Sequence, residues 1–425
     1  MKINQFIYNY CFTYKNAYII ILICLYKFFF QSSKFFIPYF LLKKPDIFKI
    51  YKEEKFESFY DAFNNAKNFI NNNINGKLMN KKYNSSSKNP KISAIIPCHN
   101  CKNYILKAVR SIQNQNFSDL EIIIGNDFSA GDTLTFLDKL KQEDSRISII
   151  NNKKNMGTLY TRTIGTLSSK GDYICPIDSD DMILDLNVFS RIFEIAEKGK
   201  FDCLIFNSIV TDLLPNIFDA KIYKNKFEKN HKPNLVLFQP ELGYYPIVPL
   251  ENKRGFQSNE ILIYAKLIKS LIYKNALNKL GKNRFSRYMI LGEDDLANVI
   301  IFNTAKMVKF ISLYGYLHIN RLGSVFNTKK NHNPDQRLIY DIYILDSMIV
   351  FSKENAKNKL ILFKYLLYIL KHKNLKRTLH RSKYDNEVFF SCLDRILHCK
   401  FISLANKNII KSRLKSLKFI KYNFL

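Results

Sequence analysis

Short apolar runs alternate with amphipathic stretches between residues 91 and 206, and this alternation constrains the fold more than any other feature of the sequence. The runs expected as strands are residues 91–97, 120–127, 146–151, 172–178 and 201–206, and the stretches with helical spacing are 104–113, 131–142 and 156–169. Strands that alternate with helices form parallel sheets with helices on both faces. The sequence therefore predicts an α/β domain with a Rossmann-like, mostly parallel sheet.

Composition divides the chain into four regions. Residues 1–50 are apolar, residues 51–90 are predicted to form a helix and an Asn/Lys/Ser-rich linker, residues 91–330 hold the main domain, and residues 331–425 form a basic helical region. A chain of 425 residues is long enough for one large domain and a smaller appendage. We therefore expect one main α/β domain with a helical C-terminal appendage.

Two apolar runs, residues 17–26 and 35–42, lie in the first region. Each is shorter than the roughly twenty residues that span a bilayer, but together, with Lys27 reaching the headgroups, they can form one imperfect span or an interfacial helix. No small-residue cleavage pattern follows them, so we expect a signal anchor and a membrane-associated protein. The alternative is an apolar helix packed on the main domain of a cytoplasmic protein.

The chain is strongly basic, with 66 Lys and Arg against 36 Asp and Glu and a formal net charge of +30. This charge favours an anionic partner such as a membrane surface or nucleotide phosphates, although a codon bias toward Lys and Asn is an alternative explanation. We expect no nucleic acid partner, because no recognisable nucleic-acid-binding module accompanies the charge.

Eight Cys are scattered along the chain, and Cys98 and Cys101 form the close pair in the main domain. A zinc site needs a second pair of thiols, or His ligands at matching spacing, and His99 alone does not complete one. We therefore expect these thiols to be free and reduced.

Acidic residues follow the predicted strand at 172–178. Asp178, Ser179, Asp180 and Asp181 form an exposed loop at the carboxyl end of a strand, which is where ligands bind in parallel sheets. Two close carboxylates repel one another unless a cation lies between them, and Mg or Mn bound to Asp178, Asp180 and phosphate oxygens would remove the repulsion. Asp181 is expected to cap the next turn, and the alternative for the whole loop is a solvated acidic turn.

Four short motifs in this region fall in a familiar order and spacing. They are Ile95, Ile96, Pro97, Cys98, His99 and Asn100; Glu121 to Asp127 with Ser129; Asn155, Gly157, Arg162 and Gly165; and Gly171, Asp172 and Tyr173 leading into the acidic loop. Together they resemble glycosyltransferase family 2, with His99 where Tyr is usual. The resemblance implies a GT-A fold and an inverting, nucleotide-sugar-dependent transferase.

The resemblance also implies roles for single residues. The nucleotide-sugar donor would be bound by Pro97, His99, Asn100, Asp127, Asn155, Gly157, Arg162 and Asp178. Asp127 would accept the imide proton of a uracil, and Arg162 would contact a phosphate or a loop carboxylate. The alternative for Arg162 is a structural salt bridge.

Further along the chain, Gly292, Glu293 and Asp294 resemble the family segment that carries the catalytic base. Asp294 would take the proton from the acceptor hydroxyl, and Glu293 would position the acceptor. These acids can instead simply begin a helix, where negative charge is favourable. Lys266 resembles the acceptor-side segment, and either His318 or Arg321 would contact the diphosphate.

The expected function is transfer of a hexose or N-acetylhexosamine from a nucleotide-sugar, most plausibly a UDP-sugar, to a saccharide, lipid or protein acceptor, with Mn or Mg as cofactor. One alternative is a catalytically degenerate protein that binds a nucleotide-sugar or a membrane surface. A nucleotidyltransferase is disfavoured because its Gly-rich, basic first turn is missing, and Pro97 to Asn100 stand in its place.

Overall fold

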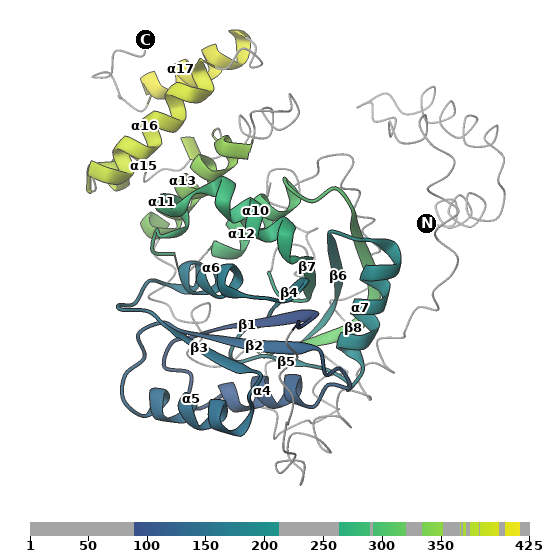
Figure 1. Ribbon diagram of the computed structural model, residues 1–425. Coiled ribbons are helices and arrows are strands. Elements are labelled where there is room, and N and C mark those ends of the chain that lie inside the picture. Colours follow the sequence, from purple (N-terminus) through teal and green to yellow (C-terminus); the bar gives the residue numbers. More distant parts are fainter. Residues whose placement is uncertain are drawn as a thin grey trace, which may run out of the picture. The chain divides into compact units, whose positions relative to one another are not determined.

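The computed structural model describes residues 89–211, 263–289, 292–319, 334–351, 366, 369–370, 375–381, 383–398 and 404–416 (Figure 1). The predictions for residues 1–50, for most of the segment 51–90 and for Arg321 lie outside these residues. All described residues belong to one compact unit, Glu57–Leu425.

The described strands form one sheet in the order β3-β2-β1-β4-β7-β6-β8-β5. The strands are β1 (Ile92–Cys98), β2 (Leu120–Asn126), β3 (Ile147–Asn151), β4 (Tyr173–Pro176), β5 (Met182–Ile183), β6 (Cys203–Thr211), β7 (Lys266–Lys269) and β8 (Val308–Ile319). Strands β3, β2, β1 and β4 are parallel, which confirms the α/β class expected from the sequence. The other half is mixed, because β7 runs antiparallel to both β4 and β6, and β5 runs antiparallel to β8.

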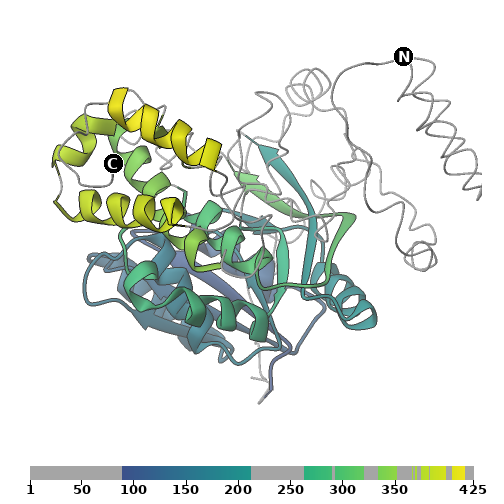
Figure 2. The same cartoon turned by 90° about the horizontal axis from the view of Figure 1, so that it is seen from above.

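Helices cover both faces of the sheet (Figures 1 and 2). Helices α4 (Ile105–Gln113), α5 (Asp132–Glu143) and α7 (Val188–Gly199) share one hydrophobic core, and α6 (Thr158–Ser168), α10 (Ser270–Leu280) and α12 (Glu293–Phe302) share the other. Alternate residues of β1 serve the two cores, since Ala94 and Ile96 pack in the first and Ile95 in the second. The central strand is therefore buried on both faces, as its continuous apolar sequence predicts.

Helix α6 lies very close to β1 and β2. A Cβ atom on Gly165 would lie 2.8 Å from Cγ2 of Ile95, and one on Gly125 would lie 2.5 Å from Cγ2 of Thr161. Only glycine permits this approach. The close packing brings the N-terminal turn of α6 to the carboxyl ends of β1 and β2, where a ligand site is expected.

The described C-terminal residues are helical, as the sequence predicts. They form α13 (Pro334–Phe351), α15 (Leu375–Arg381), α16 (Lys383–Leu397) and α17 (Leu404–Ser416), and a short helix, α11 (Lys282–Phe285), precedes α12. Asp346 on α13 accepts hydrogen bonds from Arg284 (2.9 Å) and Arg287 (2.8 Å), so α13 is tied to the segment around α11. Among the described helices, none combines the length and apolar character needed to cross a membrane.

Candidate active site

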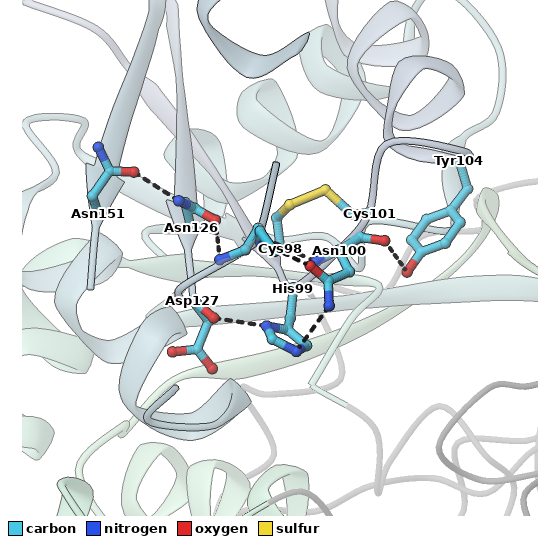
Figure 3. Close-up of a disulfide and its surroundings, with 10 residues drawn as sticks. Cys98, His99, Asn100, Cys101, Tyr104, Asn126, Asp127 and Asn151 are labelled. Atoms are coloured by element: carbon cyan, nitrogen blue, oxygen red, sulfur yellow. Dashed lines mark hydrogen bonds between the residues drawn. A yellow bond between two sulfur atoms is a disulfide. The ribbon is translucent and has the colours of Figure 1, made fainter. Parts of the chain in front are cut away.

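The turn after β1 is closed by a disulfide between Cys98 and Cys101 (Figure 3). The expectation of free thiols for this pair is wrong. The two Cα atoms are 5.5 Å apart, a distance that a disulfide spans, and the carbonyl of Cys101 accepts hydrogen bonds from the backbone N–H groups of Tyr104 and Ile105 at the start of α4. Sequence spacing alone does not reveal this approach.

His99 lies inside that turn and links three of the residues expected to bind the donor. Its Nδ1 lies 2.7 Å from the backbone carbonyl oxygen of Asp127, which can only accept, so Nδ1 is the donor (Figure 3). Nε2 is then the acceptor for the side-chain amides of Asn100 (3.2 Å) and Asn155 (3.3 Å). The side chains of His99, Asn100 and Asn155 are exposed, so this cluster is open to a ligand.

Asp127 follows β2 and is buried, and its carboxylate organises the loop that leads into α6. Oδ1 accepts hydrogen bonds from the backbone N–H of Met156 (2.7 Å) and from the side chain of Asn152 (2.8 Å), and Oδ2 accepts from the N–H of Gly157 (2.8 Å). Each carboxylate oxygen can accept two hydrogen bonds, so Oδ2 keeps the capacity to accept from a ligand. No motif in the sequence singles out Asn152.

Arg162 on α6 is buried and bridges two carboxylates from distant parts of the chain. Its Nη2 donates to Oδ1 of Asp178 (2.9 Å), and its Nη1 donates to Oδ1 of Asp294 (3.3 Å). Burial opposes the charged form of Arg162, but the charges of Asp294 and Asp178 outweigh it and raise the pKa of the guanidinium. Arg162 is therefore a permanent positive charge between the loop after β4 and the start of α12.

Helix α12 begins with the three acids Glu293, Asp294 and Asp295, and they differ in their surroundings. Burial raises the pKa of Asp294 to about 6, against the opposing charge of Arg162. Burial, together with the charge of Asp294, raises the pKa of Glu293 to about 8. Asp295 instead pairs with Arg337 of α13 (2.9 Å). The three acids do begin a helix, as the alternative interpretation expected. The pKa values of Glu293 and Asp294 also lie near neutral pH.

Asp181 is buried and forms hydrogen bonds with residues of β8. It does not cap the next turn, so the expected capping role is wrong. Its Oδ2 accepts from the hydroxyl of Tyr316 (2.8 Å) and from Nδ1 of His318 (2.9 Å), and its Oδ1 accepts from the N–H of Ile319 (2.9 Å). The Tyr316 hydroxyl also accepts from the N–H of Asp178 (3.0 Å). The acidic loop is thus fixed by a strand whose pairing the local sequence does not predict.

His318 packs against Tyr264, with ring centroids 5.1 Å apart. Burial lowers its pKa, but the hydrogen bond to Asp181 and the charge of that carboxylate outweigh burial and raise the pKa to about 9. Burial also raises the pKa of Asp181, to about 7, so the protonation of the two hydrogen-bonded side chains is coupled. Lys266, by contrast, is fully buried on β7 opposite Ile205, so its role on the acceptor side stays a prediction.

Asp178 and Asp180 offer hard carboxylate oxygens on one loop, a chemistry that suits Mg or Mn bound together with phosphate oxygens. Arg162 occupies Oδ1 of Asp178 and so orients that carboxylate. Among the described residues, no group of three or more His, Cys, Asp or Glu side chains could hold a metal by itself.

The fold and this arrangement of acidic and amide side chains define a GT-A glycosyltransferase. Residues 93–239 match the family model Glycosyl transferase family 2. The matched region belongs to glycosyltransferase family 2 and the curated relatives are glycosyltransferases, which favours this class of enzyme over a nucleotidyltransferase.

Named relatives agree with this assignment. The GalNAc(5)-diNAcBac-PP-undecaprenol beta-1,3-glucosyltransferase of Campylobacter jejuni is 28% identical over 232 residues, which cover 50% of this chain and 74% of the relative. An uncharacterized glycosyltransferase of Haemophilus influenzae is 26% identical over 318 residues, 71% of this chain and 93% of the relative. The crystal structure of S. aureus TarS 1-349 in complex with UDP-GlcNAc shares the fold, with a TM-score of 0.50, 15% identity, and coverage of 77% of this chain and 86% of that one.

Proposed function

We propose that this enzyme transfers a hexose or an N-acetylhexosamine from a UDP-sugar to a saccharide, lipid or protein acceptor, with inversion at the anomeric carbon. The observation that carries the proposal is the position of Arg162 between Asp178 and Asp294. One buried guanidinium holds a carboxylate of the donor loop beside the carboxylate that we assign as the base. The reacting groups of donor and acceptor would meet at this point.

Asp294 is the general base in this proposal. It would take the proton from the acceptor hydroxyl while the hydroxyl oxygen attacks the anomeric carbon on the face opposite the departing UDP. A pKa of about 6 leaves Asp294 ionised at neutral pH while keeping it basic enough to accept a proton. Glu293, with a pKa of about 8, is protonated at neutral pH and would donate a hydrogen bond to an acceptor oxygen.

The uracil would lie against the cluster around Asp127. Asp127 can accept the imide proton, and the exposed side chains of His99, Asn100 and Asn155 would border the base and ribose. UDP-GlcNAc is the donor named in the TarS complex, which is in accord with a UDP-sugar here. Pro97, buried opposite Gly125, would support the turn without touching the donor.

Asp178 and Asp180 would hold Mn or Mg together with the donor diphosphate. When bound, such an ion would neutralise negative charge on the departing nucleotide. We assign His318, whose pKa is raised by its hydrogen bond to Asp181, to the same end of the diphosphate. Arg321 remains a second candidate for that contact, from outside the described residues.

We also propose that the enzyme works at a membrane surface on a lipid-linked acceptor. The net charge of +30 would favour an anionic bilayer. The C. jejuni relative is named for an acceptor that carries undecaprenol.

The test of this function is nucleotide release by the purified full chain from a panel of UDP- and GDP-sugars, with Mn, with Mg and with EDTA. We expect metal-dependent release of UDP, reduced by about a hundredfold or more in Asp180→Ala. Asp138→Ala, which removes an exposed carboxylate from α5, is the matched control and should keep full activity. If no nucleotide-sugar binds in the presence of metal, the proposal is wrong.

A further inference from the structure

Tyr288 lies beside Asp127, although no motif draws attention to it. A Cβ atom on Gly157 would lie 3.3 Å from Cδ2 of the Tyr288 ring, and Gly157 is the residue whose N–H binds Oδ2 of Asp127. Burial raises the pKa of the Tyr288 hydroxyl, and the charge of Asp127 raises it further. The ring is therefore a close neighbour of the carboxylate that we assign to the nucleobase.

The residues on either side of Tyr288 are anchored, which fixes the backbone position from which its ring extends. Arg287 is partly buried, donates to Asp346 (2.8 Å) and stacks over the ring of Tyr343, 4.7 Å from its centroid. Met289 is fully buried in the core shared with α12. Tyr288 itself remains 47% exposed, so its ring is available to a ligand.

Two exposed rings thus border Asp127 from different parts of the chain. His99 comes from the turn after β1, and Tyr288 comes from the segment between α11 and α12. A half-exposed aromatic ring beside a carboxylate suits a planar base with a hydrogen-bond donor at its edge, because the ring can stack on the base while the carboxylate accepts the donor.

We infer that Tyr288 is a further donor-binding residue whose ring packs against the nucleobase that Asp127 recognises. This inference rests on the proposed function. It adds to the donor site a contact from the part of the sequence that leads to the proposed general base. Tyr288 stands six positions before Asp294, so the segment that binds the base of the donor leads directly into the helix that carries the general base. Donor binding would then also hold the start of α12 in place.

The experiment is calorimetric titration of the full chain with UDP and, separately, with pyrophosphate, both in the presence of Mn. Tyr288→Leu removes the ring, Tyr288→Phe keeps it, and Leu271→Ala, an exposed position on α10, is the control for surface substitution. We expect Tyr288→Leu to bind UDP about five- to fiftyfold more weakly, with Tyr288→Phe and Leu271→Ala close to the parent. Pyrophosphate, which has no base, should bind all four proteins equally.

Unchanged UDP affinity in Tyr288→Leu would overturn the inference while leaving the proposed function intact, and would place the ring on the acceptor side. An equal loss for UDP and pyrophosphate would also overturn it, because the ring would then act through the structure of the site. If the parent protein binds neither UDP nor any nucleotide-sugar, the proposed function fails and the inference fails with it.

Discussion

Arg162 on α6 and Asp294 on α12 are 132 residues apart in the sequence, and their side chains form a buried ion pair with Nη1 3.3 Å from Oδ1. The same guanidinium binds Asp178 on the loop after β4. One arginine therefore sets the position of two carboxylates. Its positive charge offsets the repulsion between them, without the help of solvent.

Replacement of Arg162 by Met should damage both stability and activity. Loss of the charge leaves Asp178 and Asp294 close together and partly buried without a cation, and removing one member of a buried ionic cluster typically costs about 3–5 kcal/mol. Urea unfolding measures this loss directly. Lys91→Met, which removes an exposed ion pair with Asp172, should leave the free energy of unfolding nearly unchanged. Equal effects of the two substitutions would contradict the bridging role.

The activity should fall as the pH drops through about 6. Asp294 has an ordinary pKa of 3.8 that burial raises to about 6, so below that pH it is protonated and cannot accept the proton of the acceptor. Arg162 lowers this pKa, and so Arg162→Met should move the acidic limb of the pH–rate profile to higher pH in any variant that keeps measurable activity. A flat profile between pH 5 and about 7 would argue against Asp294 as the titrating base.

Gly157→Ala should be more harmful than Gly131→Ala. Both glycines have positive φ, +84° and +55°, so each alanine would be strained by about 1–3 kcal/mol. At Gly157 the new Cβ would also lie 2.8 Å from the backbone oxygen of Met289, whereas at Gly131 it would meet nothing within 4 Å. Thermal unfolding and UDP binding compare the two, and similar losses would show that the close approach at Gly157 is unimportant.

Reduction of the Cys98–Cys101 disulfide should weaken donor binding, because His99 and Asn100 lie within the loop that it closes. A cross-link around so short a loop is worth about 2 kcal/mol in the chain-entropy estimate. Dithiothreitol should therefore lower the affinity for UDP in the parent protein. The Cys98→Ser, Cys101→Ser double variant should bind as the reduced protein does and should not respond to the reagent, and a response there would point to another of the eight cysteines.

Local sequence patterns predicted the part of the fold in which neighbouring strands and helices are also close in the sequence. The strands that contain Ile95 and Ile123, and the helix between them, follow from apolar runs and helical spacing over short segments. The antiparallel strand β7 and the pairing of β5 with β8 were not predicted, because they depend on contacts between residues far apart in the sequence, such as Ile174 with Ile268 and Met182 with Leu317.

The same limit applies to the site. Asp127, Asp178 and Asp294 could be proposed from the sequence because each follows a strand or begins a helix in a recognisable motif. The bond of Asp181 to His318 and the position of Tyr288 beside Gly157 follow only from the three-dimensional fold, and no local signal identifies them. The disulfide was missed because Cys spacing does not report the turn that brings the two residues together.

The most direct test of the account is UDP release and UDP-sugar binding by Asp294→Asn, with Asp295→Asn as the matched control. The two carboxylates are neighbours on α12, but Asp294 contacts Arg162 and Asp295 contacts Arg337. The account predicts that Asp294→Asn still binds the donor and loses about a hundredfold or more in turnover, while Asp295→Asn retains it. Full turnover in Asp294→Asn would contradict the assignment of the base.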